Sequence, residues 1–132
     1  ISACLVGSEM CIRDRFTIIP DAFLKFMQGG ETVRFLVEHD RGTEEQQHFR
    51  RRISAYADYL QQEPIPVLFS TFQGPKRLEQ MREWTHKELV GSEAATWFRF
   101  ANLPTSLDPV AVWLAPQWFT VQGQQPIALL EG

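Results

Sequence analysis

The chain has 132 residues, a length that fits a single domain. Hydrophobic residues make up 44% of it, including 10 Phe and 4 Trp, which is enough to build a packed core. The formal net charge is −3, so no overall positive field indicates a nucleic-acid partner, and any such contact must come from a local patch. No apolar run approaches the roughly 18 residues that a membrane span needs, so no membrane partner is predicted.

The first fifteen residues, ISACLVGSEMCIRDR, differ in character from the rest of the chain. Back-translated, residues 9–15 can be read as codons containing AGATGTGTATAAGAGACAG, the transposon end used in sequencing adapters, and residues 4–8 fit the preceding adapter bases. We interpret residues 1–15 as an adapter-derived, non-native segment, and the alternative is a genuine N-terminal strand. The domain then comprises residues 16–132 and is expected to be truncated at its N-terminus.

Both cysteines of the chain, Cys4 and Cys11, lie in this segment. The remaining residues therefore predict neither a disulfide nor a cysteine zinc site, and a cytoplasmic setting is the default expectation. The three histidines also lack metal-ligand spacing with one another.

Residues 17–40, TIIPDAFLKFMQGGETVRFLVEHD, predict two strands joined by the glycine pair at 29–30, where a tight hairpin needs positive φ. In that register Asp21 lies opposite Glu38, and Asp40 shares their face because side chains alternate along a strand. Like charges directly opposite each other cost up to about 1 kcal/mol per pair. The spacing therefore predicts a cation, a donor cluster or a proton among the three carboxylates; the alternative is that these strand-end acids are merely solvated.

A helix is predicted from Thr43 to just before Pro64, with Thr43 and Gln46 as a capping box. It carries three consecutive arginines at 50–52. At about 100° per residue, Arg52 lies beside the apolar stripe and can reach the carboxylate end of the hairpin. Arg50 and Arg51 point toward solvent. They either form an ordinary solvated helix face or contact phosphate groups, and the sequence leaves both interpretations open.

The rest of the chain predicts an α/β fold with a mixed central sheet. Residues 65–72 form a nearly continuous apolar run, which is typical of a buried strand, and the strand–helix–strand order favours a parallel crossover. The further predicted elements are a helix over 75–90, a strand over 95–101, a short apolar element over 110–114 and an edge strand over 118–121.

The order of elements resembles the PD-(D/E)XK nuclease-like core. It consists of an apolar strand that ends in Pro-Asp at 20–21, a hairpin, an acidic strand end at 38–40 and a helix. More narrowly, the segments PDAFLKF, FLVEHDRGTE, RRRISAYADYL and VLFSTF, with Arg77, resemble the replication-relaxation family of plasmid-associated proteins. The resemblance covers most of residues 20–89. It implies a restriction-endonuclease-like α/β fold with a hairpin and crossover strands flanked by helices. It also implies a role in plasmid replication and DNA relaxation, DNA as the partner, and an upstream winged helix-turn-helix in the missing part.

Carried over by position, the resemblance implies that Asp21 and Glu38 are metal-binding carboxylates and that Mg²⁺ is the cofactor. Asp40 stands where an active nuclease of the wider superfamily has its lysine, and the family's helix lysine falls on Arg52. Arginine keeps the charge but is a poor proton carrier because it stays protonated. The implied catalytic set is Asp21, Glu38, Asp40 and Arg52, and the implied DNA contacts are Arg41, Arg50, Arg51 and Arg77.

Two functions are therefore open from the sequence. The first is a DNA-binding plasmid replication protein with a nuclease-like core, with or without metal-dependent phosphodiester cleavage or nicking. The second is a catalytically inactive interaction scaffold of a DNA-binding protein.

Overall fold

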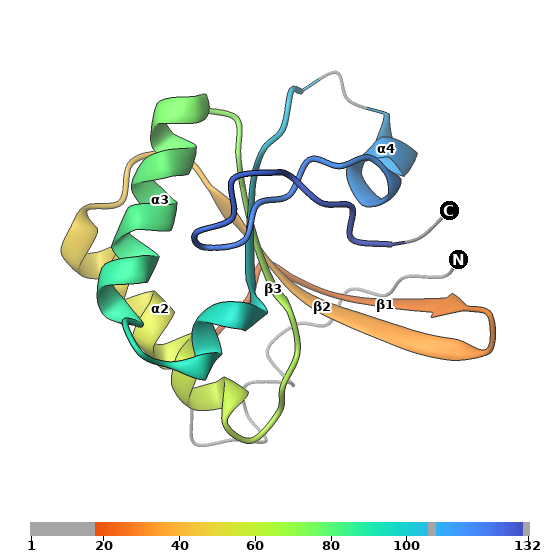
Figure 1. The fold of residues 1–132 in the computed structure, drawn as a ribbon, viewed down its shortest axis with the longest axis horizontal. Coiled ribbons are helices and arrows are strands. Elements are labelled where there is room, and N and C mark those ends of the chain that lie inside the picture. The colour runs from red at the N-terminus through yellow and green to blue at the C-terminus, as the bar shows by residue number, and fades with distance from the viewer. Residues whose placement is uncertain (1–17, 106–107, 131–132) are drawn as a thin grey trace.

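The computed structural model describes residues 18–105 and 108–130, so the segment interpreted as adapter-derived lies outside the described residues. Four strands form one sheet: β1 (Ala22–Gln28), β2 (Glu31–Asp40), β3 (Val67–Thr71) and β4 (Phe98–Asn102), in that spatial order (Figure 1). The helices are α2 (Gln46–Leu60), α3 (Pro75–Glu88) and α4 (Pro109–Leu114), and a 3₁₀ helix, η1 (Glu93–Trp97), precedes β4. This mixed α/β architecture confirms the predicted fold class, while its restriction-endonuclease-like character stays a prediction. None of the helices in the described ranges could span a lipid bilayer.

β1 and β2 form the predicted hairpin in the predicted register. Ala22 pairs with Val37, and Gln28 pairs with Glu31 at the turn. The glycines at 29–30 have φ angles of 58° and 83°, values that residues with a Cβ rarely adopt. Because a slip of one residue would move every side chain to the opposite face, this turn fixes which face of the sheet carries the acids.

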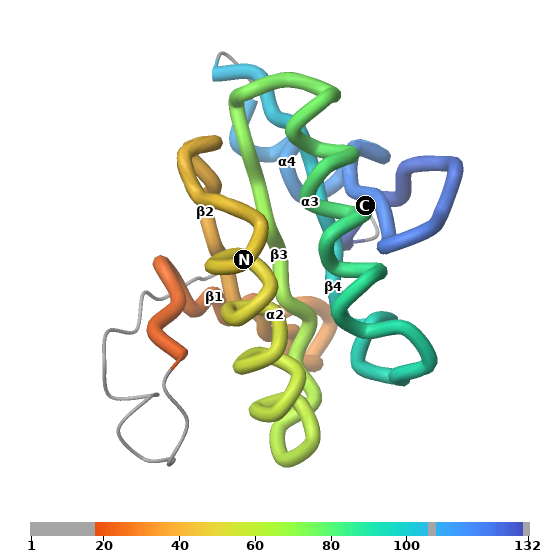
Figure 2. Tube along the Cα trace, turned by 90° about the vertical axis from the view of Figure 1, so that its left-hand side faces the viewer, coloured from red at the N-terminus to blue at the C-terminus, as the bar shows by residue number. Residues whose placement is uncertain are grey.

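β2, β3 and β4 run parallel, and α2 and α3 lie in the two crossover connections. Both helices cover the same face of the sheet, at the left of Figure 1, and Figure 2 shows the four strands side by side behind them. The carboxyl ends of the three parallel strands meet at one edge, where Asp40, Thr71 and Asn102 form a row across the sheet. The chain leaves this edge to begin α2 and α3, so polar side chains of both helices can reach it.

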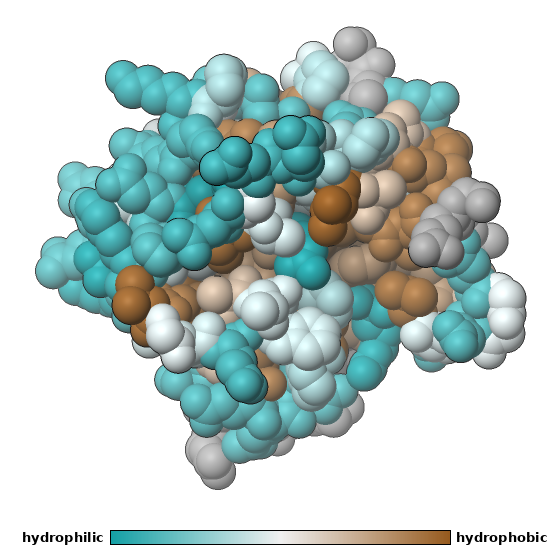
Figure 3. Space-filling view, in the orientation of Figure 1, coloured by the Kyte–Doolittle hydropathy of each residue, from teal (hydrophilic) through white to brown (hydrophobic). Residues whose placement is uncertain are grey.

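A hydrophobic cluster lies on each face of the sheet. Under α2 and α3, Leu36 and Phe69 pack with Phe49 of α2, and all three are fully buried. On the other face, the ring of Phe26 contacts that of Trp113 in α4, with 4.8 Å between centroids. In Figure 3 hydrophilic residues cover the outer side of α2 and α3, whereas apolar residues gather over α4 and the neighbouring part of the hairpin.

The start of α2 differs from the sequence expectation. The N-cap residue is Glu45, and no side chain caps the helix, so the predicted capping box of Thr43 and Gln46 is wrong. Glu44, which the sequence assigned to the first turn of this helix, instead lies before it and contacts Arg52 of α2.

Two strand predictions near the C-terminus are also corrected. The strand expected over 95–101 begins only at Phe98, because residues 93–97 form η1, whose N-cap Ser92 accepts a hydrogen bond from the N–H of Ala94. The edge strand expected over 118–121 is reduced to isolated bridges, Phe100 with Phe119 and Trp118 with Ile127. Sequence alternation could not distinguish these short segments from strands, because each presents apolar residues to the sheet.

Candidate functional site

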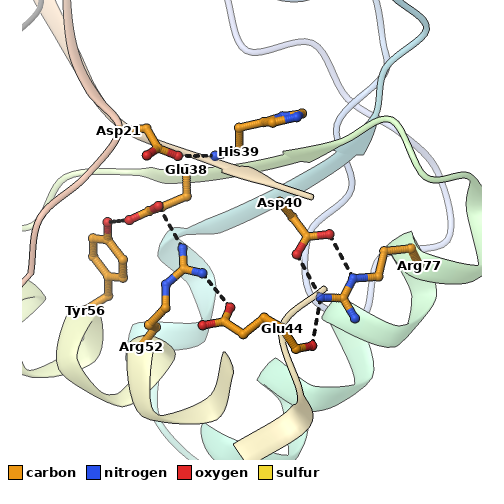
Figure 4. Close-up of polar contacts among 8 residues, drawn as sticks. All are labelled: Asp21, Glu38, His39, Asp40, Glu44, Arg52, Tyr56 and Arg77. Carbon is orange, nitrogen blue, oxygen red and sulfur yellow. Dashed lines mark hydrogen bonds and ion pairs between the residues drawn. The ribbon is translucent and has the colours of Figure 1, made fainter. Parts of the chain in front are cut away.

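The predicted acidic pair meets at the open end of the hairpin (Figure 4). The hairpin register brings Asp21 opposite Glu38, as predicted, and Asp21 lies near enough to raise the pKa of Glu38. Asp21 also accepts a 2.7 Å hydrogen bond from the backbone N–H of His39. The side chain of His39 points to the opposite face, where Nδ1 lies 3.1 Å from Oγ of Ser70. His39 therefore contacts both faces of β2, through its backbone on one side and its ring on the other.

Glu38 is buried, and both of its carboxyl oxygens have partners from α2. Its residue is 6% exposed. Nη2 of Arg52 lies 2.7 Å from Oε1, and the hydroxyl of Tyr56 donates to Oε2. Arg52 and Tyr56 are four residues apart, which places them on the same face of the helix, as helical geometry requires for a shared partner.

The electrostatics of this group are unusual for a carboxylic acid. Burial, with a smaller contribution from Asp21, raises the pKa of Glu38 to about 7, although Tyr56 and Arg52 both act to lower it. Burial, with the adjacent Glu38, raises the pKa of Tyr56 as well, so its hydroxyl remains a donor. Near neutral pH the Glu38 carboxyl is therefore poised between its protonated and ionised forms.

Arg52 bridges two acids from different segments. Its Nη1 lies 2.5 Å from Oε1 of Glu44, while its Nη2 contacts Glu38. Burial opposes the charge on Arg52, but Glu38 and Glu44 outweigh burial and raise the pKa of the guanidinium above its ordinary value. The guanidinium carbon also lies 5.4 Å from the centre of the Phe69 ring, within cation–π distance. The sequence thus predicted correctly that Arg52 reaches the carboxylate end of the hairpin.

Asp40 lies on the same side of β2 as Glu38 but binds a different arginine. Arg77 of α3 donates to both of its carboxylate oxygens, at 2.8 Å each, in the bidentate geometry that makes such pairs strong. Asp40 is 3% exposed and Arg77 is 8% exposed. Burial acts to raise the pKa of Asp40, but Arg77 outweighs it and holds that pKa below its ordinary value.

The remaining arginines of the predicted set lie toward solvent. Nε of Arg50 is 2.9 Å from Oε1 of Glu88 in α3. Arg41 and Arg51 are exposed, and neither has a side-chain partner among residues 18–105 and 108–130. A hollow of about 600 Å³ opens beside α2, lined by Gln46, Gln47, Arg50, Arg51, Ser54 and Glu88. A smaller one of about 230 Å³ lies at the sheet edge, lined by His39, Asp40, Arg41, Thr43, Glu44 and Arg52.

Sequence reasoning missed two members of the network. Neither Tyr56 nor Glu44 was among the candidate site residues that the sequence predicted. The spacing of Arg52 and Tyr56 is a signal for a shared partner. No sequence signal indicates that Glu44 folds back on Arg52, because that contact depends on where the link between β2 and α2 turns.

The donor set does not suit Mg²⁺ in this arrangement. Mg²⁺ requires oxygen ligands in near-octahedral geometry. Both Glu38 oxygens are already engaged by a guanidinium and a hydroxyl, and Asp40 is engaged by Arg77. In the described part of the chain, no three His, Cys, Asp or Glu side chains are grouped so that they could hold a metal ion. A metal ion at Asp21 and Glu38 stays a prediction from the sequence. The contacts of Glu38 fit the guanidinium of Arg52 as the nearby cation better than they fit Mg²⁺.

A family model described as replication-relaxation matches residues 5–68, just under half of the chain. Over these residues the chain is similar to the replication-relaxation family. The match confirms the resemblance on which the sequence prediction rested, and the family's description links the chain to replication. No match was found among curated proteins or among solved structures.

The replication-relaxation region covers the hairpin, α2 and the start of β3, so it includes Asp21, Glu38, Asp40 and Arg52. Arg77 lies beyond it. The match also begins inside the first fifteen residues. The adapter-derived origin of that segment, like the nuclease-like character of the core, stays a prediction.

The buried Asp40–Arg77 pair should be important for stability. Asp40→Asn should lower the free energy of unfolding by about 3–5 kcal/mol, because it leaves a buried guanidinium without its counter-charge. Urea unfolding measures the loss, and Arg77→Met combined with Asp40→Asn should recover part of it. Lys87→Met, in the exposed pair of Lys87 with Glu83, is the control and should cost less than about 1 kcal/mol. Equal losses for Asp40→Asn and Lys87→Met would contradict a stabilising role.

Glu38 should make the stability of the protein fall between about pH 4.5 and 7. Its folded pKa of about 7 lies above the ordinary value of 4.5, so the folded state keeps a proton that the unfolded chain loses in this window. The fall is at most about 3 kcal/mol. Asp40 has the opposite shift, so its contribution is lost only at lower pH.

Denaturant unfolding of the wild type and of Glu38→Gln across this pH range measures the effect. The variant should show a clearly flatter profile, because a side-chain amide does not titrate. The same slope in both proteins would show that Glu38 titrates normally.

Proposed function

We propose that this chain is a DNA-binding protein of plasmid replication and that it contacts the DNA backbone through the exposed face of α2. The observation that carries the proposal is the position of Arg51. It is exposed beside the larger hollow and has no partner among the described residues, whereas Arg52 on the same helix is committed to Glu38 and Glu44.

The hollow beside α2 presents the side chains that commonly bind phosphates. Arginine, glutamine and serine donate many of the hydrogen bonds that proteins make to DNA backbone oxygens. Gln46, Gln47, Ser54 and Arg51 supply these groups along one side of the helix. The one acid in the lining, Glu88, is paired with Arg50, so it offers little repulsion to a phosphate. Because the net charge of the chain is −3, a nucleic-acid contact must come from a local patch, and these side chains form one.

Arg41 supports the same orientation of DNA on the protein. It lies in the lining of the smaller hollow, at the end of β2 and just before α2, and it is exposed. Backbone contacts of this kind orient a protein on DNA but carry no sequence information. Sequence selection would then rest on another part of the protein.

A catalytically inactive interaction scaffold is the second candidate. The internal pairing of Glu38 and Asp40 with arginines favours it, because a site used for cleavage would need these acids available to a metal ion. DNA binding itself separates the two candidates, since a scaffold alone has no need of the exposed arginines.

Fluorescence anisotropy with a labelled duplex, at several salt concentrations, tests the proposal. Arg51→Gln should weaken binding several-fold and reduce the slope of log K against log salt by about 1, because one phosphate contact is lost. Arg41→Gln should act in the same direction. Lys25→Gln is the matched control: it removes the same charge from an exposed position on β1, outside both hollows.

The control should bind DNA as the wild type does. Equal weakening by Lys25→Gln and Arg51→Gln would indicate only a response to net charge. Absence of DNA binding by the wild type would favour the scaffold.

A further inference from the structure

The acidic site at the end of the hairpin already holds a cation, which the protein itself supplies. Two arginines on two helices neutralise two acids on one strand: Arg52 of α2 pairs with Glu38, and Arg77 of α3 pairs with Asp40. Figure 4 shows both guanidinium groups pointing toward β2 from the helix side of the sheet.

We propose that Arg52 is the resident cation of this site and replaces a divalent metal there. The structural core would thus be independent of metal, and the Glu38–Arg52 pair would hold α2 against the hairpin. The inference deepens the proposed function, since it makes the DNA contact one of binding without cleavage. It rests on side-chain geometry that stands whether or not DNA binds.

The position of the guanidinium supports this assignment. Its two Nη atoms lie 2.7 Å from Glu38 and 2.5 Å from Glu44, so the positive charge sits between two carboxylates. Asp21 approaches Glu38 from the hairpin side. Two acids, Glu38 and Glu44, therefore flank one cation, and that cation is Arg52.

The surroundings of Arg52 favour a permanent contact over an occasional one. Phe69, a fully buried residue of β3, lies under the guanidinium at 5.4 Å. Tyr56 holds the second oxygen of Glu38, so the carboxylate cannot rotate toward another ligand without losing two partners. A metal ion would have to displace a charged group that is anchored by two ion pairs and an aromatic ring.

Removal of the arginine charge should uncover the metal affinity of the acids. In Arg52→Met the apolar stem can still cover Phe69, while Glu38 and Glu44 are left without their cation and Asp21 lies beside Glu38. This variant should bind Mn²⁺ with one-to-one stoichiometry, and Mn²⁺ should raise its Tm. The wild type should show no saturable Mn²⁺ binding at concentrations that saturate the variant.

Isothermal titration calorimetry and thermal unfolding, each with Mn²⁺ or Mg²⁺ alone as the probe, test the inference. Lys25→Met is the matched control, because it removes a positive charge from an exposed position with no acid partner among the described residues, and its response to Mn²⁺ should match that of the wild type. Addition of Glu38→Gln to Arg52→Met should abolish the gained binding. Arg52→Lys keeps the charge and should remain without metal.

Several results would overturn the inference. Saturable Mn²⁺ binding by the wild type that Glu38→Gln removes would show that the site accepts metal in the presence of Arg52. A folded Arg52→Met that binds no Mn²⁺ would show that the acids do not form a cation site. If Arg52→Met folds only with Mn²⁺, the inference is supported. If it does not fold at all, the titrations of the wild type and Arg52→Lys decide, because saturable binding by either at Glu38 would contradict it.

This test is separable from that of the proposed function. Metal binding is measured on the protein alone, so a failure to bind DNA leaves it unaffected. If the wild type binds DNA, we expect its affinity for DNA to be the same in EDTA and in Mg²⁺. A requirement for Mg²⁺ in DNA binding would contradict the resident-cation assignment without excluding a DNA contact.

Discussion

The pairing of Glu38 with Arg52, together with the apolar packing of Phe49 against Leu36, holds α2 against the hairpin. Glu38 belongs to the hairpin, whose outer strand contacts only β2 within the sheet, and Arg52 belongs to the first crossover helix. A buried carboxylate without a counter-charge is costly, so the helix must be placed where its arginine and tyrosine can reach that acid. The turn sets the register of the hairpin, and this contact then fixes how α2 is rotated at that end and where its outer arginines point.

The same requirement explains why consecutive arginines differ in role. A helix advances about 100° per residue, so a residue aimed at the sheet edge leaves its predecessor directed away from it. With Arg52 held against Glu38 and Glu44, Arg51 is exposed, and Arg50 reaches across to Glu88 of α3. The internal ion pair therefore sets which positive charges the surface presents to a phosphate backbone.

Much of this arrangement could be predicted from local patterns. The glycine pair at 29–30 and the alternation of apolar residues were sufficient for the hairpin register, and with it the approach of Asp21 to Glu38. Helical periodicity was sufficient to direct Arg52 toward the same end. These features depend on chain geometry over short separations, which sequence spacing encodes directly.

The partners of the acids could not be predicted in the same way. Asp40 and Arg77 are 37 residues apart, and their pairing depends on how far the second crossover helix lies from β2. Glu44 appeared to be a helix-start residue, but the helix begins at Gln46 and leaves Glu44 to turn back on Arg52. The sequence thus located the acids, whereas tertiary packing determined that Glu38 and Asp40 pair with arginines.

The most direct test of this account observes the Arg52 guanidinium itself. In nitrogen-15 NMR spectra of the arginine side chains, a guanidinium held by two carboxylates gives separate, slowly exchanging Nη signals, whereas a free one gives averaged signals. We expect separate Arg52 signals, assigned by their absence in Arg52→Lys, that do not change when excess Mg²⁺ is added. Averaged Arg52 signals, or separate signals that Mg²⁺ converts to averaged ones, would contradict the claim that this arginine is the permanent cation of the site.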